Sequence, residues 1–213
     1  MFDESFLSQL KRWNEKTSLK NLKFNRGIER ETLRVSKDGS ISNRPHPEAL
    51  GSPLTNPYIT TDFAEALIEL VTPKFDNVDD LYSCLQDLHV FTAQNIDEDE
   101  YLWAHSMPCR IEKESDINIA NYGTNDSGML KHIYRKGLRA RYGSIMQCVS
   151  GIHYNFSIDA ACYKNLLGDE YTQDMVDDLY LSLIRNFKRN FWFILAQLSA
   201  SPVADKSYVS GRS

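Results

Sequence analysis

The sequence contains neither of the two common phosphate-binding loops, because it has no GxGxxG and no GxxxxGK[ST] pattern. Any phosphate group must therefore be held by other means. Cysteine is also scarce: four residues in 213, with no CxxC pair and no zinc-knuckle spacing. We expect reduced thiols rather than a disulfide framework, as is usual in the cytoplasm.

Positive charge and long apolar runs are also limited. The 29 acidic residues outnumber 24 basic ones, giving a formal net charge of −5, so the electrostatic footprint of a nucleic-acid-binding protein is absent. The most apolar run, residues 191–198, is shorter than the roughly 20 residues that cross a bilayer. The start lacks the basic and apolar regions of a signal peptide. We expect a cytoplasmic protein that binds neither nucleic acid nor membrane.

The remaining composition is that of an ordinary globular protein, with 42% hydrophobic and 25% charged residues. The length fits one domain or one large lobe, and no repeat or clear linker divides it. Apolar spacing and turn residues predict helices over 3–14, 78–95, 127–142 and 171–199, and strands over 26–35, from about 66 to 72, and over 145–158. These strands do not alternate with helices as in βαβ units, so we expect an α+β fold with an antiparallel or irregular sheet.

Three groups of polar side chains on the expected strands are candidates for chemistry. The first is Glu29 and Glu31, which share one face of a strand at a separation of roughly 6.6 Å. Two close carboxylates repel each other, which a fold tolerates if a cation offsets the charge or if the face is solvated. For an isolated Glu-x-Glu, a solvated face is the simpler interpretation.

The second group is Asp62, Glu65 and Glu69, which interrupt an otherwise apolar run. Glu69 would share a strand face with Leu67 and Val71, where a carboxylate is costly unless it is paired or ligates a metal. A salt bridge to an arginine, or a surface helix turn, would also explain it.

The third group lies on the expected strand 145–158. One face carries Gln147, His153 and Asn155, together with Gly151, which permits close backbone approach. The opposite face is apolar and is expected to face the core. A lone histidine on a polar face is often only structural. Taken together, however, the three groups offer oxygen ligands and one imidazole to a shared face, which suits Mg2+ or Mn2+ better than Zn2+.

The sequence resembles the proteobacterial glutamate–cysteine ligase family. The resemblance is carried, in family order over nearly the whole chain, by residues 26–35 (RGIERETLRV), 46–52 (HPEALGS), 59–69 (ITTDFAEALIE), 106–109 (SMPC), 122–124 (YGT), 134–138 (YRKGL), 141–143 (RYG), 146–147 (MQ) and 150–157 (SGIHYNFS). It implies a funnel-like antiparallel sheet flanked by helices, similar to the catalytic domain of glutamine synthetase.

The resemblance also implies roles for particular residues. The implied metal ligands are Glu29, Glu31, Asp62, Glu69 and His153. The implied substrate-binding residues are Tyr134 in a cysteine pocket, Leu138 and Gln147 beside it, and Asn155, which rests mainly on sharing the His153 face.

The implied reaction is the first step of glutathione biosynthesis, with glutamate, cysteine and ATP as substrates. The γ-carboxylate of glutamate takes the γ-phosphate of ATP, and the cysteine amine then displaces phosphate from γ-glutamyl phosphate. Mg2+ or Mn2+ would screen the phosphates.

Family members are more than twice as long as this chain. We therefore expect residues 1–213 to be the N-terminal part of a single catalytic domain, incomplete at the C-terminal side and inactive without a C-terminal half. Two alternatives remain open: a related carboxylate–amine ligase with another amine acceptor, and a non-catalytic metal- or nucleotide-binding remnant.

Overall fold

The computed structural model describes residues 4, 8, 11, 22–199 and 203–209, so the helix expected over residues 3–14 falls largely outside the described residues. The chain divides into two compact units. One comprises Met1–Arg26 and Phe156–Ser199, and the other comprises Gly27–Asn155 and Ala200–Ser213.

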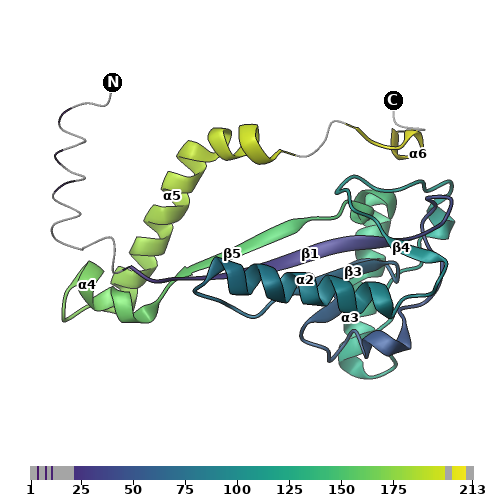
Figure 1. The fold of residues 1–213 in the computed structure, drawn as a ribbon, viewed down its shortest axis with the longest axis horizontal. Helices are drawn as coiled ribbons and strands as arrows, with labels where there is room; N and C mark the ends of the chain where they lie inside the picture. The colour runs from purple at the N-terminus through teal and green to yellow at the C-terminus, as the bar shows by residue number, and fades with distance from the viewer. Residues whose placement is uncertain (1–3, 5–7, 9–10, 12–21, 200–202, 210–213) are drawn as a thin grey trace. The chain divides into compact units, whose positions relative to one another are not determined.

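A five-stranded sheet forms the framework of the structure (Figure 1). Its order is β2-β3-β1-β4, and β5 also pairs with β1. The β1–β3, β1–β4 and β2–β3 pairs are antiparallel, which confirms the expected α+β class with an antiparallel sheet. The strands are β1 (Phe24–Ser36), β2 (Ile59–Thr61), β3 (Leu67–Val71), β4 (Glu100–Leu102) and β5 (Ile152–Ile158).

Two long helices belong to the larger unit, and both lie where apolar spacing predicted them. Asn77 caps the N-terminus of α2 (Val78–Gln94) and Asn125 caps that of α3 (Asp126–Tyr142). Each side chain accepts a hydrogen bond from a first-turn N–H. The shorter helices of this unit are η2 (Glu48–Leu50), η3 (Glu114–Asp116), η4 (Ile145–Cys148) and α6 (Lys206–Val209). Residues 43–57 contain no other helix or strand than η2.

The smaller unit contains η5 (Ala160–Cys162), α4 (Tyr163–Leu167) and the predicted long helix, α5 (Gln173–Leu198). The side chain of Thr172 caps the N-terminus of α5 by accepting a hydrogen bond from the Met175 N–H. The Tyr180 hydroxyl of α5 accepts a bond from the Ile158 N–H at 3.0 Å and lies 3.3 Å from the Tyr163 hydroxyl. These polar contacts join the end of β5, α4 and α5 within this unit.

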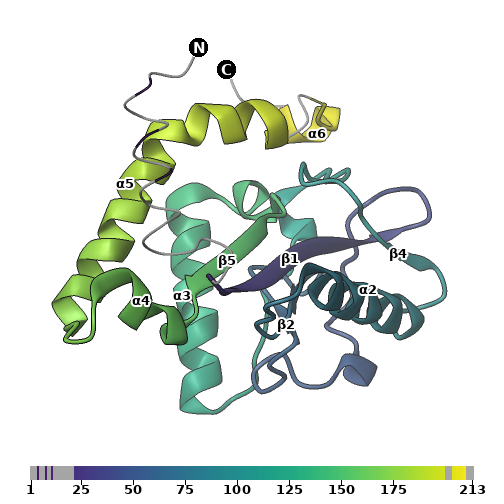
Figure 2. The same cartoon turned by 60° about the vertical axis from the view of Figure 1, so that its left-hand side comes forward.

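The period-2 alternation of β3 divides its side chains between two apolar clusters in the larger unit. Figure 2 shows the helices α2 and α3 of this unit from a second side. Ile68 and Leu70 pack with Leu85 and Leu88 of α2. Leu67 belongs to the other cluster. Glu69 lies on the face opposite to Ile68 and Leu70, as alternation predicted, and it therefore projects away from α2.

The β1 side chains are divided in the same way, and one face carries a buried ion pair. Arg34 is fully buried, and its Nη1 donates to Glu100 Oε2 of β4 at 2.7 Å. Its Nη2 donates to the carbonyls of Arg44 and Pro45, each at 2.8 Å. Arg34 therefore joins β1, β4 and the loop that precedes η2.

The expected strand over 145–158 is wrong in its first half. Residues Ile145–Cys148 form η4, and the strand begins only at Ile152. The Gln147 N–H bonds back to Ser144 O at 3.0 Å, a local turn that an alternating pattern cannot distinguish from a strand. Gln147 therefore does not share a strand face with His153.

The prediction that the apolar side of that strand faces the core is also wrong in part. Cys148 and Ser150 are buried, but Ile152, Tyr154 and Phe156 of β5 are 61%, 58% and 40% exposed in the described part of the chain. The sequence pattern identifies apolar side chains, but it cannot show whether another element covers them.

We predict that Glu100→Gln lowers the free energy of unfolding by about 3 kcal/mol, because it leaves the buried Arg34 charge without its carboxylate partner. Urea unfolding measures this change. The matched control is Asp97→Asn, which weakens the solvent-exposed pair between Asp97 and Arg44 and should cost less than about 1 kcal/mol. Equal losses in the two variants would contradict the structural role of the buried pair.

Candidate metal centre

Strand register brings the predicted acidic residues together. In the antiparallel β1–β3 pair, Glu31 lies opposite Glu69, and Glu29 lies opposite Val71. Directly opposed residues project on the same side of a sheet. Two glutamates of β1 and one of β3 therefore share the face that α2 does not cover.

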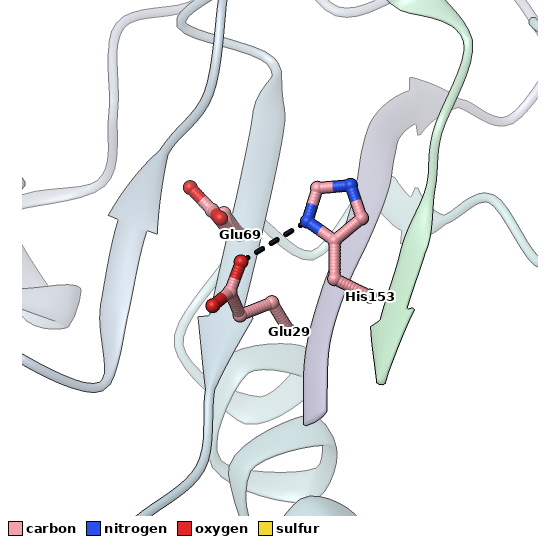
Figure 3. Close-up of side chains that lie close together, drawn as sticks. All are labelled: Glu29, Glu69 and His153. Atoms are coloured by element: carbon pink, nitrogen blue, oxygen red, sulfur yellow. Dashed lines mark hydrogen bonds and ion pairs between the residues drawn. The ribbon is translucent and has the colours of Figure 1, made fainter. Parts of the chain in front are cut away.

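Three side chains from three strands converge on this face (Figure 3). Glu29 of β1, Glu69 of β3 and His153 of β5 each offer one ligand atom, and these atoms all lie within 4.8 Å of one another. His153 Nδ1 lies 3.0 Å from Glu29 Oε2. Two carboxylates and an imidazole at this spacing can bind one divalent cation.

Glu31 lies at the edge of this group and is anchored by backbone. Its Oε2 accepts the Gly151 N–H at 2.6 Å, and its own N–H donates to Gly151 O at 3.0 Å. Glu31 Oε1 lies 3.8 Å from His153 Nε2. The approach is close at Gly151, since a Cβ there would lie 3.2 Å from His153 Nε2 and 3.4 Å from Glu31 Oε2.

The electrostatics show how closely the carboxylates are grouped. Burial, followed by the charges of Asp62, Glu31 and Glu29, raises the pKa of Glu69 from its ordinary value to about 7. Burial also raises the pKa of Glu31, with the Asp62 charge contributing. Asp62, from the segment after β2, is thus close enough to act on both glutamates. Neighbouring carboxylates thus add to the raised pKa of Glu69 and Glu31, as expected of a site that needs a cation.

Glu29 and His153, in contrast, favour each other's charged forms. The hydrogen bond from His153, followed by that from Asn155, lowers the pKa of Glu29. The same bond with Glu29 raises the pKa of His153. An imidazole can donate this bond from Nδ1 and keep Nε2 for a metal, a common arrangement of metal-binding histidines.

Glu65, the third acid of the apolar run, has a different place. It is buried, and its two carboxylate oxygens accept the N–H groups of His46 and Asn121, each at 2.6 Å. Glu65 therefore joins two loops to the β2–β3 connection, which we define as residues 62–66. The sequence marked Glu65 as unusual but not which partners it has.

The salt-bridge interpretation of Glu69 is not supported among the described residues, where it forms no ion pair with lysine or arginine. The solvated-face interpretation of Glu29 and Glu31 also fails in part, because the Glu31 side chain is only 9% exposed.

The residues expected to bind substrate are dispersed. Tyr134 and Leu138 lie one turn apart on α3; Tyr134 is 63% exposed, while Leu138 packs against the apolar cluster around Leu67. Gln147 lies in η4. Asn155 donates to Glu29 Oε1 at 2.7 Å, so its visible contact orients a metal-ligand candidate. Of these four, Asn155 is the one with a side-chain hydrogen bond to the acidic group in the described part of the chain.

The fold and this site define an α+β protein with a candidate divalent-cation centre on one face of an antiparallel sheet. The family model described as glutamate-cysteine ligase matches residues 7–213. The chain therefore belongs to the glutamate–cysteine ligase family.

Individual relatives agree with this assignment. The chain is 47% identical over 190 residues to the glutamate–cysteine ligase of Pseudomonas entomophila (strain L48), covering 87% of this chain and 36% of the relative. It is 46% identical over 193 residues to that of Aliivibrio fischeri (strain MJ11), covering 89% and 37%. The chain thus spans about a third of the length of these curated relatives.

Solved structures give the same picture. A Francisella tularensis glutamate–cysteine ligase in complex with AMP is similar with a TM-score of 0.83 and 41% identity, over 91% of this chain and 38% of that one. A bifunctional glutathione synthetase from Pasteurella multocida is similar with a TM-score of 0.78 and 33% identity, over 92% and 25%. Within the described residues, no helix combines the length and apolar character required to cross a membrane.

We predict that the metal-free chain becomes less stable as pH rises from about 5 to about 8. The folded-state pKa of Glu69 is about 7, above the ordinary value of 4.5, so between these values the folded chain holds a proton that the unfolded chain has lost. The raised pKa of His153 acts in the same direction above 6.5. Partial exposure limits the Glu69 contribution to on the order of 2 kcal/mol.

Urea unfolding across this pH range measures the effect. Glu69→Gln should flatten the profile, while Glu98→Gln, at an exposed position, should leave it unchanged. A Glu69→Gln profile as steep as that of the unaltered chain would contradict the assignment.

A second prediction concerns the close approach at Gly151. Gly151→Ala should weaken Mn2+ binding about tenfold, because the added Cβ displaces His153 and Glu31. Isothermal titration calorimetry measures the affinity. Gly137→Ala is the matched control, since a Cβ at that position meets nothing within 4 Å. Unchanged Mn2+ affinity in Gly151→Ala would show that these side chains do not ligate the cation.

Proposed function

We propose that this chain provides the metal-binding face of an ATP-dependent ligase that joins the γ-carboxylate of glutamate to the amine of cysteine. The observation that carries the proposal is the convergence of Glu29, Glu69 and His153 within 4.8 Å, in a chain that belongs to the glutamate–cysteine ligase family. On this proposal, residues 1–213 are the N-terminal part of one catalytic domain.

The donor set fits Mg2+ or Mn2+. Glu29, Glu69 and His153 would hold a cation, and Glu31 and Asp62 contribute the additional carboxylates that raise the Glu69 pKa. Hard oxygen donors with a single nitrogen favour these ions over Zn2+. None of the four cysteines is among the converging ligand atoms.

The proposed chemistry is phosphoryl transfer from ATP followed by amide formation. The γ-carboxylate of glutamate attacks the γ-phosphorus of ATP, releasing ADP, and the cysteine amine then displaces phosphate from γ-glutamyl phosphate. A bound cation would supply positive charge against the transferring phosphoryl group. Asn155 and His153 hold the Glu29 carboxylate in a fixed orientation through bonds of 2.7 and 3.0 Å. Such preorganisation is how a site of this kind lowers the barrier.

Substrate contacts are assigned to α3 and η4. Tyr134 presents a largely exposed ring, and Leu138 on the same helix face is supported by the core cluster beneath it. We assign these two residues and Gln147 to the cysteine-binding side of the site. The substrates of this reaction are cytoplasmic metabolites, so we propose that the protein is cytoplasmic.

The proposal is tested with the chain itself and with a chimera that joins it to the remaining two thirds of the Pseudomonas entomophila relative. Each is supplied with glutamate, cysteine and Mg-ATP, and γ-glutamylcysteine is measured by mass. Because the chain spans 36% of that relative, we expect product from the chimera and none from the chain alone.

Two variants assign the activity to the proposed centre. Glu69→Gln and His153→Asn in the chimera should each lower kcat by at least about a hundredfold, on the scale of losing one group that stabilises transition-state charge. The exposed control Glu98→Gln should retain activity. A fully active Glu69→Gln chimera would refute the metal centre, and product formed with other amines but not with cysteine would indicate a related ligase.

A further inference from the structure

The β2–β3 connection carries Asp62 and is held by backbone and side-chain hydrogen bonds. The Asp62 N–H donates to Leu67 O at 3.0 Å, and the Ala120 N–H donates to Phe63 O at 3.0 Å. These backbone bonds fix the path of the connection. They leave the carbonyl of Asp62 itself to be bound by side chains.

Tyr122 supplies the first of those side chains. It is only 4% exposed, and its hydroxyl donates to Thr61 O at 2.7 Å and lies 3.2 Å from Asp62 O. The Thr61 hydroxyl donates in turn to the Tyr122 hydroxyl at 3.0 Å. The Tyr122 hydroxyl thus binds two consecutive carbonyls at the end of β2.

Arg135 of α3 supplies the second. Its Nε donates to Asp62 O, and its Nη1 donates to Lys131 O at 3.0 Å. The guanidinium lies 4.6 Å from the centroid of the Tyr122 ring, a cation–π distance. Arg135 and Tyr122 therefore bind the same carbonyl and also contact each other, so they act as one unit.

We propose that Arg135 and Tyr122 are positioning residues that fix the backbone of Asp62, at the start of the β2–β3 connection, beside the cation centre. This inference rests on the proposed function, because it concerns the same site. Neither residue belongs to the converging ligand group. Asp62 is not in that group either, but its charge acts on Glu31 and Glu69 and raises the pKa of both. Arg135 and Tyr122 would therefore act on the centre through Asp62, in the way that outer partners orient the groups of a metal site.

The charge of Arg135 separates positioning from electrostatics. A positive charge near a cation centre repels the cation, so removing it would strengthen cation binding if charge alone mattered. Arg135→Lys keeps the charge but loses the planar Nε donor that binds Asp62 O. Positioning therefore predicts weaker binding in this variant, whereas a purely electrostatic role predicts no change.

The experiment measures the Mn2+ dissociation constant of the whole chain by calorimetry, together with its melting temperature. We expect Arg135→Lys to weaken Mn2+ binding about tenfold. The matched control is Arg141→Lys, which makes the same change on the same helix, where the guanidinium lies 5.7 Å from the Tyr142 ring. The control should bind Mn2+ like the unaltered chain.

A second variant keeps the proposal testable if lysine perturbs the helix. Tyr122→Phe removes only the hydroxyl and should also weaken Mn2+ binding about tenfold. The double variant should be weaker than either single variant by less than the product of their effects, because both residues act on one carbonyl.

The outcomes are distinct. A lower melting temperature with unchanged Mn2+ affinity in both single variants would assign a merely structural role and overturn the positioning proposal alone. An unaltered chain that binds no Mn2+ would overturn the metal centre and this inference with it.

Discussion

The structure depends on one constraint: several carboxylates share a single sheet face. The β1–β3 register places Glu31 opposite Glu69, and Asp62 lies near enough to raise the pKa of both. Two unit charges 4 Å apart repel by about 4 kcal/mol at an effective dielectric of 20. Burial, together with the charges of Asp62, Glu31 and Glu29, raises the Glu69 pKa to about 7, so protonation of Glu69 below that pH removes part of the repulsion. A divalent cation would offset the repulsion between the carboxylates at any pH above about 7.

The rest of the larger unit keeps that face in place. Strand alternation buries Ile68 and Leu70 against α2 and thereby directs Glu69 to the opposite side. The buried pair of Arg34 and Glu100 joins β1 to β4, and Arg34 also binds the loop that precedes η2. The strands β1 and β3 thus carry both the buried contacts of the scaffold and the glutamates of the site.

Much of this arrangement follows from the sequence. Period-2 alternation correctly placed Glu69 on the face away from Ile68 and Leu70, and helical spacing gave α2, α3 and α5 to within two residues. Register between distant strands could not be read, because it depends on turn geometry and on long-range packing. The turn at η4 was mistaken for a strand, since a short apolar run fits both. The pairing of Arg135 with Asp62 O joins residues 73 positions apart, which no local pattern encodes.

The most direct test of the account is electron–nuclear double resonance of Mn2+ bound to the chain labelled with 15N-histidine. The account predicts a single 15N coupling from a directly bound imidazole, lost in His153→Asn while Mn2+ still binds more weakly to the carboxylates. A spectrum without 15N coupling, or one in which the coupling persists in His153→Asn, would contradict the assignment of this sheet face as the cation centre.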